Sequence, residues 1–117
     1  MKDDAHRNFI SNLPCAICGD DTTVECAHVR FGDIRVAKSQ ALGKKPSDAF
    51  TMPLCGRHHR EQHGGNERMF WKARRYDPIL VSLALYAVSG DLQTGEKILS
   101  FWRPHGQGIG EATASGG

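Results

Sequence analysis

Two separated cysteine and histidine pairs constrain the fold of this chain more than any other feature of its sequence. Cys15 and Cys18 form a Cys-x2-Cys turn, and Cys55 and His58 form a Cys-x2-His pair later in the chain. Structural zinc is held tetrahedrally by four such sulfur and imidazole ligands. The two pairs therefore predict a structural zinc site that joins two distant segments of one small fold.

Cys26 is the remaining cysteine, and its part in this site is open. It could replace His58 as the fourth ligand, or form a cluster with Cys15, Cys18 and His28. Its position in a predicted strand favours a small buried side chain instead. We therefore leave Cys26 out of the predicted zinc site.

Three further histidines, His28, His59 and His63, lie beside these pairs. His59 and His63 are four residues apart, so on a helix they share a face that the adjacent His58 does not. A lone histidine in a strand is ordinarily structural, but pairing of two strands under that helix would bring His28 to the same point. A divalent ion there leaves room for water and a phosphate, and an imidazole beside it can take a proton from the water.

The 117-residue length predicts one domain with a modest core, which a metal would stabilise. The apolar pattern indicates a helix at residues 5–13, strands at 22–31 and 50–54 joined by a loop at 32–47, and a helix at 56–63. Further helices are expected at 67–76 and from Asp77-Pro78 to Ser89-Gly90, with a final apolar patch at 91–103 whose pattern is less clear. We expect an α+β domain over residues 1–104, with its core at 14–64, C-terminal helices at 66–103 and a flexible glycine-rich tail at 105–117.

The cysteines and the hydrophobic pattern predict a cytoplasmic protein. The N-terminal residues do not form a secretory segment, and thiols in a cytosolic protein favour metal binding over disulfides. The longest apolar run, residues 78–88, is shorter than the ~20 residues of a membrane span, so no membrane contact is expected. A helix that is apolar on most sides needs partners on most sides, and we expect a homodimer contact at this run.

Positive charge is concentrated around the histidines, although the net charge of the chain is only +2. Residues 28–75 contain eleven lysines and arginines against four acidic residues. Such an excess is also common on an ordinary solvated surface, but beside a metal site it suits a polyanion such as nucleic acid. The predicted phosphate contacts are Arg30, Arg35, Lys38, Lys44, Lys45, Arg57 and Arg60.

Four segments follow one another in the order Cys-x2-Cys, Ala-His-Val-Arg, Gly-Lys-Lys-Pro-Ser-Asp and Met-Pro-Leu-Cys-x2-His-His-x3-His. This order resembles the zinc-knuckle branch of the HNH endonucleases, which have a ββα-metal core. The resemblance covers about residues 9–71, and its last segment is the most specific. Within that branch the chain is most similar to phage recombination-enhancement nucleases and their prophage-encoded relatives.

The resemblance implies roles for the residues that match it. His28 would be the general base that activates water, and His59 and His63 would bind a catalytic divalent cation. Asp48 stands near the position of the family's central asparagine, where it would orient His28 or join the metal shell. The cation would be Mg, Mn, Ni or Zn, and histidine ligands suit the last three better than magnesium, which prefers oxygen.

Two positions depart from the family pattern. Ala27 stands where many HNH enzymes carry an aspartate or histidine metal ligand just before the base, so the ion would depend on His59, His63 and Asp48. His58 replaces the usual second cysteine of the distal pair, which zinc accepts because imidazole is one of its normal ligands.

Two functions of different class follow from the sequence. The first is a metal-dependent endonuclease that hydrolyses DNA phosphodiester bonds, with a phage or prophage role in DNA recombination or processing implied by the resemblance. Its substrate would be free DNA or a recombinase–DNA filament. The second is a degenerate, non-catalytic HNH fold that binds nucleic acid. The set of His28, His59 and His63 favours the enzyme, because a pure binding module has no need of three imidazoles.

Overall fold

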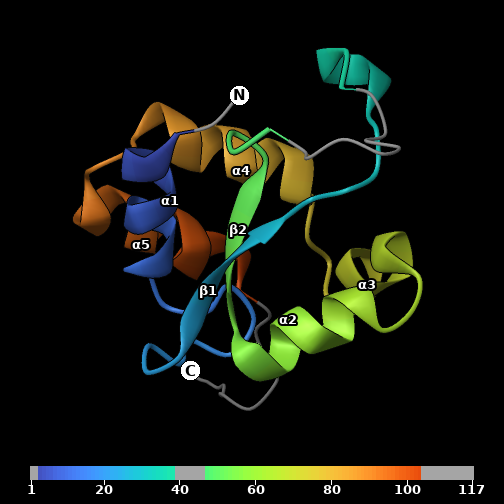
Figure 1. Cartoon of the computed structure of the whole chain (residues 1–117), viewed down its shortest axis with the longest axis horizontal. Coiled ribbons are helices and arrows are strands. Elements are labelled where there is room, and N and C mark those ends of the chain that lie inside the picture. Colours follow the sequence, from blue (N-terminus) through green and yellow to red (C-terminus); the bar gives the residue numbers. More distant parts are fainter. Residues whose placement is uncertain (1–2, 39–46, 104–117) are drawn as a thin grey trace.

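The predicted order of strand, loop, strand and helix is present in the computed structural model, which describes residues 3–38 and 47–103. Within these residues the chain forms five α-helices, a short 3-10 helix and a two-stranded antiparallel sheet (Figure 1), which confirms the α+β class. The elements are α1 (Asp4–Ser11), β1 (Val24–His28), η1 (Ile34–Val36), β2 (Thr51–Cys55), α2 (Gly56–His63), α3 (Glu67–Ala73), α4 (Pro78–Ala87) and α5 (Leu92–Trp102).

The hairpin and α2 form one continuous ββα unit. In the sheet, Val24 lies opposite Cys55 and His28 lies opposite Thr51. Helix α2 begins directly after β2, with Cys55 as its N-cap residue, and contacts both strands. Because no loop separates β2 from α2, the end of the strand sets the direction of the helix.

Several boundaries differ from those predicted. Strand β1 is shorter than residues 22–31, because its partner β2 has five residues and the ladder ends with that partner. Helix α1 ends at Ser11 and α3 ends at Ala73, before the predicted residues 13 and 76. Arg75 has a φ of 59°, a left-handed conformation that does not continue a helix. The apolar patch at 91–103 forms α5, whose first turn is capped by the Asp91 carboxylate.

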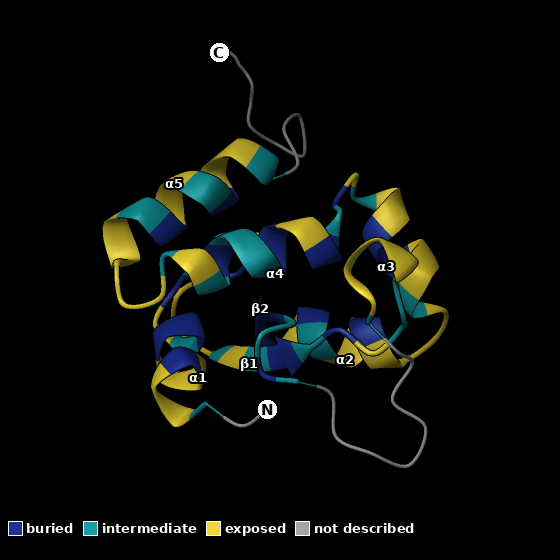
Figure 2. Cartoon of the chain, turned by 90° about the horizontal axis from the view of Figure 1, so that it is seen from above, coloured by how far each residue is buried: buried dark blue, intermediate teal, exposed yellow. Residues whose placement is uncertain are grey.

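The helices are arranged in two layers around the sheet. Figure 2 shows α4 and α5 in one layer, and the sheet with α1 and α2 in the other. The core lies between the layers, where Met52 and Leu54 of β2 and Val81 and Leu85 of α4 are all fully buried. The sheet therefore has α4 across one face, while α1 and α2 pack beside it.

Helix α4 has partners within the chain for most of its apolar surface. Ile79, Val81 and Leu85 are buried, and the helix contacts β2 and α5, although Leu80 is 53% exposed. Neither α4 nor any other helix of the described residues is long and apolar enough to cross a membrane. The homodimer contact expected at this helix stays a prediction.

Helix α5 approaches α1 closely at Gly95. A Cβ atom added to Gly95 would lie 3.0 Å from Cδ2 of Leu13 and 3.1 Å from Cζ of Phe9. Both of those side chains are buried in the core. The missing side chain of Gly95 thus allows the last helix to pack against the first.

We expect Gly95→Leu to lower the free energy of unfolding by about 1–3 kcal/mol, because the added side chain overpacks the contact with Leu13 and Phe9. Gly65→Leu is the matched control, since an added Cβ there meets nothing within 4 Å. Urea unfolding followed by circular dichroism measures both variants. Equal stability of the two variants would contradict the close packing of α5 on α1.

Candidate metal centre and neighbouring histidines

The four predicted zinc ligands come together in the structure. Cys15 and Cys18 lie in the turn after α1, Cys55 ends β2, and His58 lies in the first turn of α2. Their ligand atoms all lie within 4.8 Å of one another. The Cys3His group, as we name these four residues, could therefore hold a metal ion such as zinc.

The distances within the Cys3His group match the edges of a zinc tetrahedron. Sγ of Cys18 lies 3.9 Å from Sγ of Cys55, and Nδ1 of His58 lies 3.3 Å from Sγ of Cys55 and 3.6 Å from Sγ of Cys15. Tetrahedral zinc requires roughly 3.8 Å between two sulfurs and roughly 3.6 Å between sulfur and nitrogen, from its usual bond lengths. The side chains thus fit a zinc ion with little rearrangement, and His58 would bind it through Nδ1.

The Cys-x2-Cys turn is shaped by Gly19 and by hydrogen bonds to Cys15. Gly19 has a φ of 78°, which glycine adopts readily, and its N–H donates to the carbonyl of Cys15. The N–H of Ile17 donates to Sγ of Cys15 at 3.4 Å. These contacts fix the position of the Cys15 sulfur within the turn.

Burial and hydrogen bonds shift the pKa values of this group in different directions. Burial opposes ionisation of Cys55, but hydrogen bonds from the backbone of His58 and from Cys18 lower its pKa. Burial, with the nearby sulfur of Cys15, raises the pKa of Cys18 to about 11. Burial also lowers the pKa of His58, so its imidazole is neutral at pH 7 and can bind a metal. A divalent cation would stabilise the thiolates that burial disfavours.

Cys26 takes no part in the Cys3His group. Its side chain is half-buried against the core, and burial raises its pKa. The two alternative ligand sets that include Cys26 are not formed among the described residues. This placement agrees with the interpretation of Cys26 as a small core residue.

His28 is held by the carboxylate of Asp48. Nε2 of His28, at the end of β1, lies 2.7 Å from Oδ1 of Asp48, which is buried in the turn before β2. The other carboxylate oxygen, Oδ2, accepts a hydrogen bond from the backbone N–H of Asp3. Burial acts to raise the pKa of Asp48, but the hydrogen bonds from His28 and Asp3 have the larger combined effect. The pKa is therefore lowered, and the carboxylate is ionised. Asp48 is expected either to orient His28 or to bind the metal. Its contact with Nε2 of His28 agrees with the first of these roles.

His59 and His63 lie on one face of α2, as their spacing predicts, with ring centroids 4.8 Å apart. Nδ1 of His59 lies 2.6 Å from Oε1 of Glu25 on β1. The pKa of His63 is lowered, mainly by burial and further by the charges of His59, Arg30 and His28. The three imidazoles of the predicted second site therefore lie within electrostatic range of one another, and His63 is neutral at pH 7.

These three imidazoles are less tightly grouped than the Cys3His group. In the part of the chain that the structure describes, the Cys3His group is the one set of three or more potential ligands close enough together to hold an ion. A cation bound by His59 and His63 would thus depend on further ligands, such as water or a phosphate oxygen.

Sequence reasoning misses three polar residues beside the histidines. Gln62 is fully buried, and its Nε2 donates to the carbonyl of His28 at 3.0 Å and to Oε2 of Glu67 at 2.8 Å. Glu67 is the second of these residues. Glu25 on β1 is the third, and its place in the strand is the one feature that the sequence could have indicated. Glu25 stands two residues before Ala27, on the same face of the strand.

Of the seven predicted phosphate contacts, three are exposed arginines without a strong partner among the described residues, and two lie outside those residues. Arg30, Arg57 and Arg60 have exposed side chains. Arg57 forms a 3.5 Å ion pair with a glutamate one helical turn away, a surface pair that contributes little. Lys44 and Lys45 lie outside the described residues. The exposed arginines are thus available to a polyanion.

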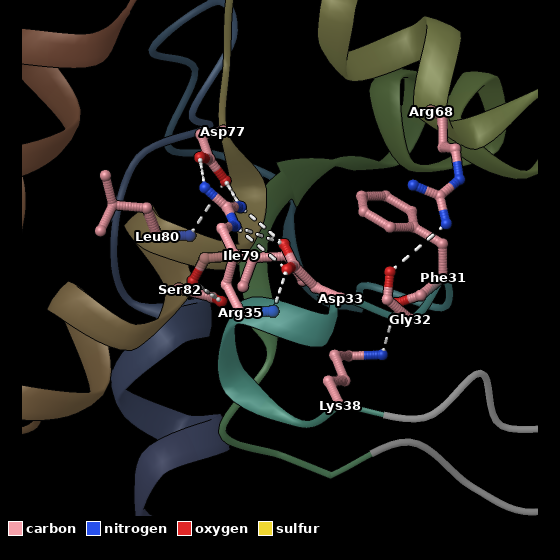
Figure 3. Close-up of polar contacts among 10 residues, drawn as sticks. All are labelled: Phe31, Gly32, Asp33, Arg35, Lys38, Arg68, Asp77, Ile79, Leu80 and Ser82. Carbon is pink, nitrogen blue, oxygen red and sulfur yellow. Dashed lines mark hydrogen bonds and ion pairs between the residues drawn. The ribbon is translucent and has the colours of Figure 1, made fainter.

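The other two predicted phosphate contacts already have partners within the chain. Figure 3 shows the guanidinium of Arg35 between the carboxylates of Asp33 and Asp77, at 2.6 Å and 3.0 Å. Nζ of Lys38 donates to the carbonyl of Phe31 at 2.7 Å. A phosphate would have to compete with these groups, so Arg35 and Lys38 are weaker candidates than their charge alone indicates.

Comparison with known proteins does not place the chain in a family. No protein-family model matches it, and neither a curated protein nor a solved structure matches it significantly.

We expect Cys55→Ser to abolish stoichiometric zinc binding and to unfold the chain or reduce its cooperativity, because a structural zinc contributes folding free energy. Cys26→Ser is the matched control, since Cys26 lies outside the Cys3His group. Metal content by mass spectrometry and thermal unfolding test both variants. A Cys55→Ser variant with normal zinc content and a normal melting profile would contradict the assignment.

Proposed function

We propose that the chain is a metal-dependent endonuclease of the HNH type, which hydrolyses DNA phosphodiester bonds. The observation that supports this most directly is the His28–Asp48 pair at the end of β1, beside a helix that carries His59 and His63. A histidine oriented by a buried carboxylate beside two further imidazoles is an arrangement suited to water activation.

In this proposal His28 is the general base. Its Nε2 is bonded to Asp48, so Nδ1 is the nitrogen that accepts a proton from the attacking water. Asp48 keeps the ring in one orientation and stabilises the positive charge that forms on it. The water oxygen attacks phosphorus in line with the leaving sugar oxygen. The bond from phosphorus to that oxygen breaks, the oxygen takes a proton from solvent water to become a hydroxyl, and the phosphate stays on the other end of the cut strand.

His59 and His63 would hold the catalytic divalent cation, which when bound stabilises negative charge on the phosphate. Glu25 accepts a hydrogen bond from Nδ1–H of His59, which leaves Nε2 as its metal-binding nitrogen. Carboxylates commonly orient metal-binding histidines in this way and raise their basicity. Glu25 thus compensates in part for Ala27, and two imidazole ligands favour Mn, Ni or Zn over Mg.

The charged surface is consistent with DNA as the substrate. Arg30 follows His28 by two residues, and Arg57 and Arg60 are exposed on α2, so cations flank the imidazoles. Such a surface attracts a phosphate backbone and makes binding strongly dependent on salt. Free DNA and a recombinase–DNA filament present the same phosphates, and a phage or prophage role in recombination is part of the proposal.

A non-catalytic nucleic-acid-binding module is the second candidate. The observation in its favour is that, among the described residues, the Cys3His group alone is compact enough to hold an ion without additional ligands. In that case zinc supports the fold, and the exposed arginines hold nucleic acid without cutting it.

We expect chelator-treated protein, reconstituted with zinc in the Cys3His group, to nick supercoiled plasmid when Mn or Ni is added. His28→Ala should lower the nicking rate by at least about 100-fold, in line with the removal of a general base, while DNA binding persists. Gln93→Ala, an exposed substitution on α5, is the control. Full nicking by His28→Ala would remove His28 as the base, and no nicking with any metal would favour the binding module.

Glu25→Gln should raise the metal concentration needed for half-maximal nicking by about 10–100-fold, because His59 is then no longer oriented by a carboxylate. The rate at saturating metal should change much less. Glu96→Gln, an exposed substitution on α5, controls for the removal of one negative charge. An unchanged metal requirement would show that Glu25 does not act through His59.

A further inference from the structure

An open cleft of about 400 Å³ lies between the loop after β1, helix α3, the start of α4 and the end of α5. Its size is within the range of small-ligand sites. The residues that line it include four aromatic residues and three cations, namely Phe31, Trp71, Tyr76, Trp102, Arg68, Lys72 and Arg75. None of these residues belongs to the Cys3His group or to the proposed catalytic set.

The cations of this cleft are not neutralised within the described residues. Arg68, Lys72 and Arg75 form no ion pair there with a carboxylate, whereas Arg74 on the same segment pairs with an acidic residue at 3.0 Å. The acidic residue that lines the cleft, Asp77, is bound to a guanidinium outside it. With three cations against one carboxylate in its lining, the cleft presents an excess of positive charge to an anion.

The aromatic wall is held in place before any ligand binds. The rings of Tyr76 and Trp102 are stacked, with centroids 5.9 Å apart and 22° between their planes. Tyr76 is buried, and its hydroxyl donates to the carbonyl of Ala16 at 2.9 Å. Trp102 is only partly buried, so part of its ring is available for contact at the rim of the cleft.

Phe31, in the loop after β1, also lines the cleft, and Figure 3 shows the polar contacts that hold this loop. The guanidinium of Arg68 lies over the ring of Phe31 at 4.5 Å and donates to the carbonyl of Gly32. Arg35 joins Asp33 of the same loop to Asp77 at the start of α4. These contacts fix Phe31 beside the cations.

We propose that this cleft binds an unpaired nucleotide of a single-stranded nucleic acid. The base would stack on Trp102 and Phe31, while Arg68, Lys72 and Arg75 would bind the adjoining phosphates. Aromatic stacking with a cationic groove is the general mode of single-strand binding, and it tolerates any base. Bases in a duplex are already stacked on one another, so this cleft would distinguish a single strand from a duplex.

The location of the cleft connects it to the proposed nuclease site. Phe31 follows His28 by three residues. On the other side, Nε1 of Trp71 donates to Glu67, which also accepts from the Gln62 amide that holds the His28 carbonyl. The inference rests on the proposed function in one respect, namely that the chain binds nucleic acid. It does not require that the chain cleaves it.

Fluorescence anisotropy of the zinc-loaded full chain with labelled oligothymidylate, and with a duplex of equal length, tests this inference. We expect Trp102→Ala to weaken single-strand binding by about tenfold or more while duplex binding changes little, and Trp102→Phe to restore it. Leu92→Ala is the control, because this apolar residue of the same helix is 41% exposed and does not line the cleft. Circular dichroism verifies that each variant is folded.

A second variant tests the cationic half of the cleft. Replacing Arg68, Lys72 and Arg75 together with glutamine should weaken single-strand binding and reduce its salt dependence, by about 0.7 in log–log slope for each phosphate that the cleft no longer binds. Lys97→Gln on α5 is the control for an exposed cation. Oligouridylate in the same titrations determines whether the single strand is DNA or RNA.

The possible outcomes separate this inference from the proposed nuclease. Wild-type protein that does not bind oligothymidylate, or Trp102→Ala protein that loses single-strand and duplex binding equally, would overturn the role of the cleft whatever the nicking assay shows. Binding that depends on Trp102 in a protein that nicks no plasmid with any metal would support the cleft and contradict the nuclease.

Discussion

The Cys3His group, whose distances fit a tetrahedral zinc ion, is the constraint on which our account of the structure depends. It joins the turn after α1 to the end of β2 and to the first turn of α2. Because Cys55 ends the strand and His58 lies in the first turn of the helix, a metal held there would fix the direction in which α2 leaves the sheet. A chain of 117 residues buries a modest core, so we expect metal binding to contribute a substantial part of its folding free energy.

The adjacent residues His58 and His59 link this metal group to the proposed catalytic site. Successive helical residues point about 100° apart, so His58 faces the sulfurs while His59 faces Glu25 on the neighbouring strand. Two imidazoles of the proposed site have carboxylate partners, and both partners lie outside α2. Glu25 contacts His59, and Asp48 contacts His28. A displacement of α2 would therefore move the proposed metal ligands relative to the proposed base, so the proposed catalysis would depend on a metal in the Cys3His group.

The sequence predicts those parts of the fold that depend on local spacing. The two ligand pairs and the bounds of α2 follow from residues three or four positions apart, and the structure confirms both. Helix α5 is not predicted firmly, because Gly95 interrupts its apolar pattern and is explained only by the contact with α1. The Gln62 contact with His28 and the capture of Arg35 by Asp77 join residues more than thirty positions apart. Local spacing in the sequence cannot show which polar side chains already have a partner elsewhere in the chain.

X-ray absorption at the zinc edge of the purified, full-length protein tests the central claim most directly. We predict one tightly bound zinc per chain, surrounded by three sulfur atoms at about 2.3 Å and one nitrogen at about 2.0–2.1 Å. The same spectrum should be retained by a variant with His59 and His63 both changed to alanine, because neither belongs to the Cys3His group. Absence of bound zinc, or a shell of nitrogen and oxygen without sulfur, would contradict the account.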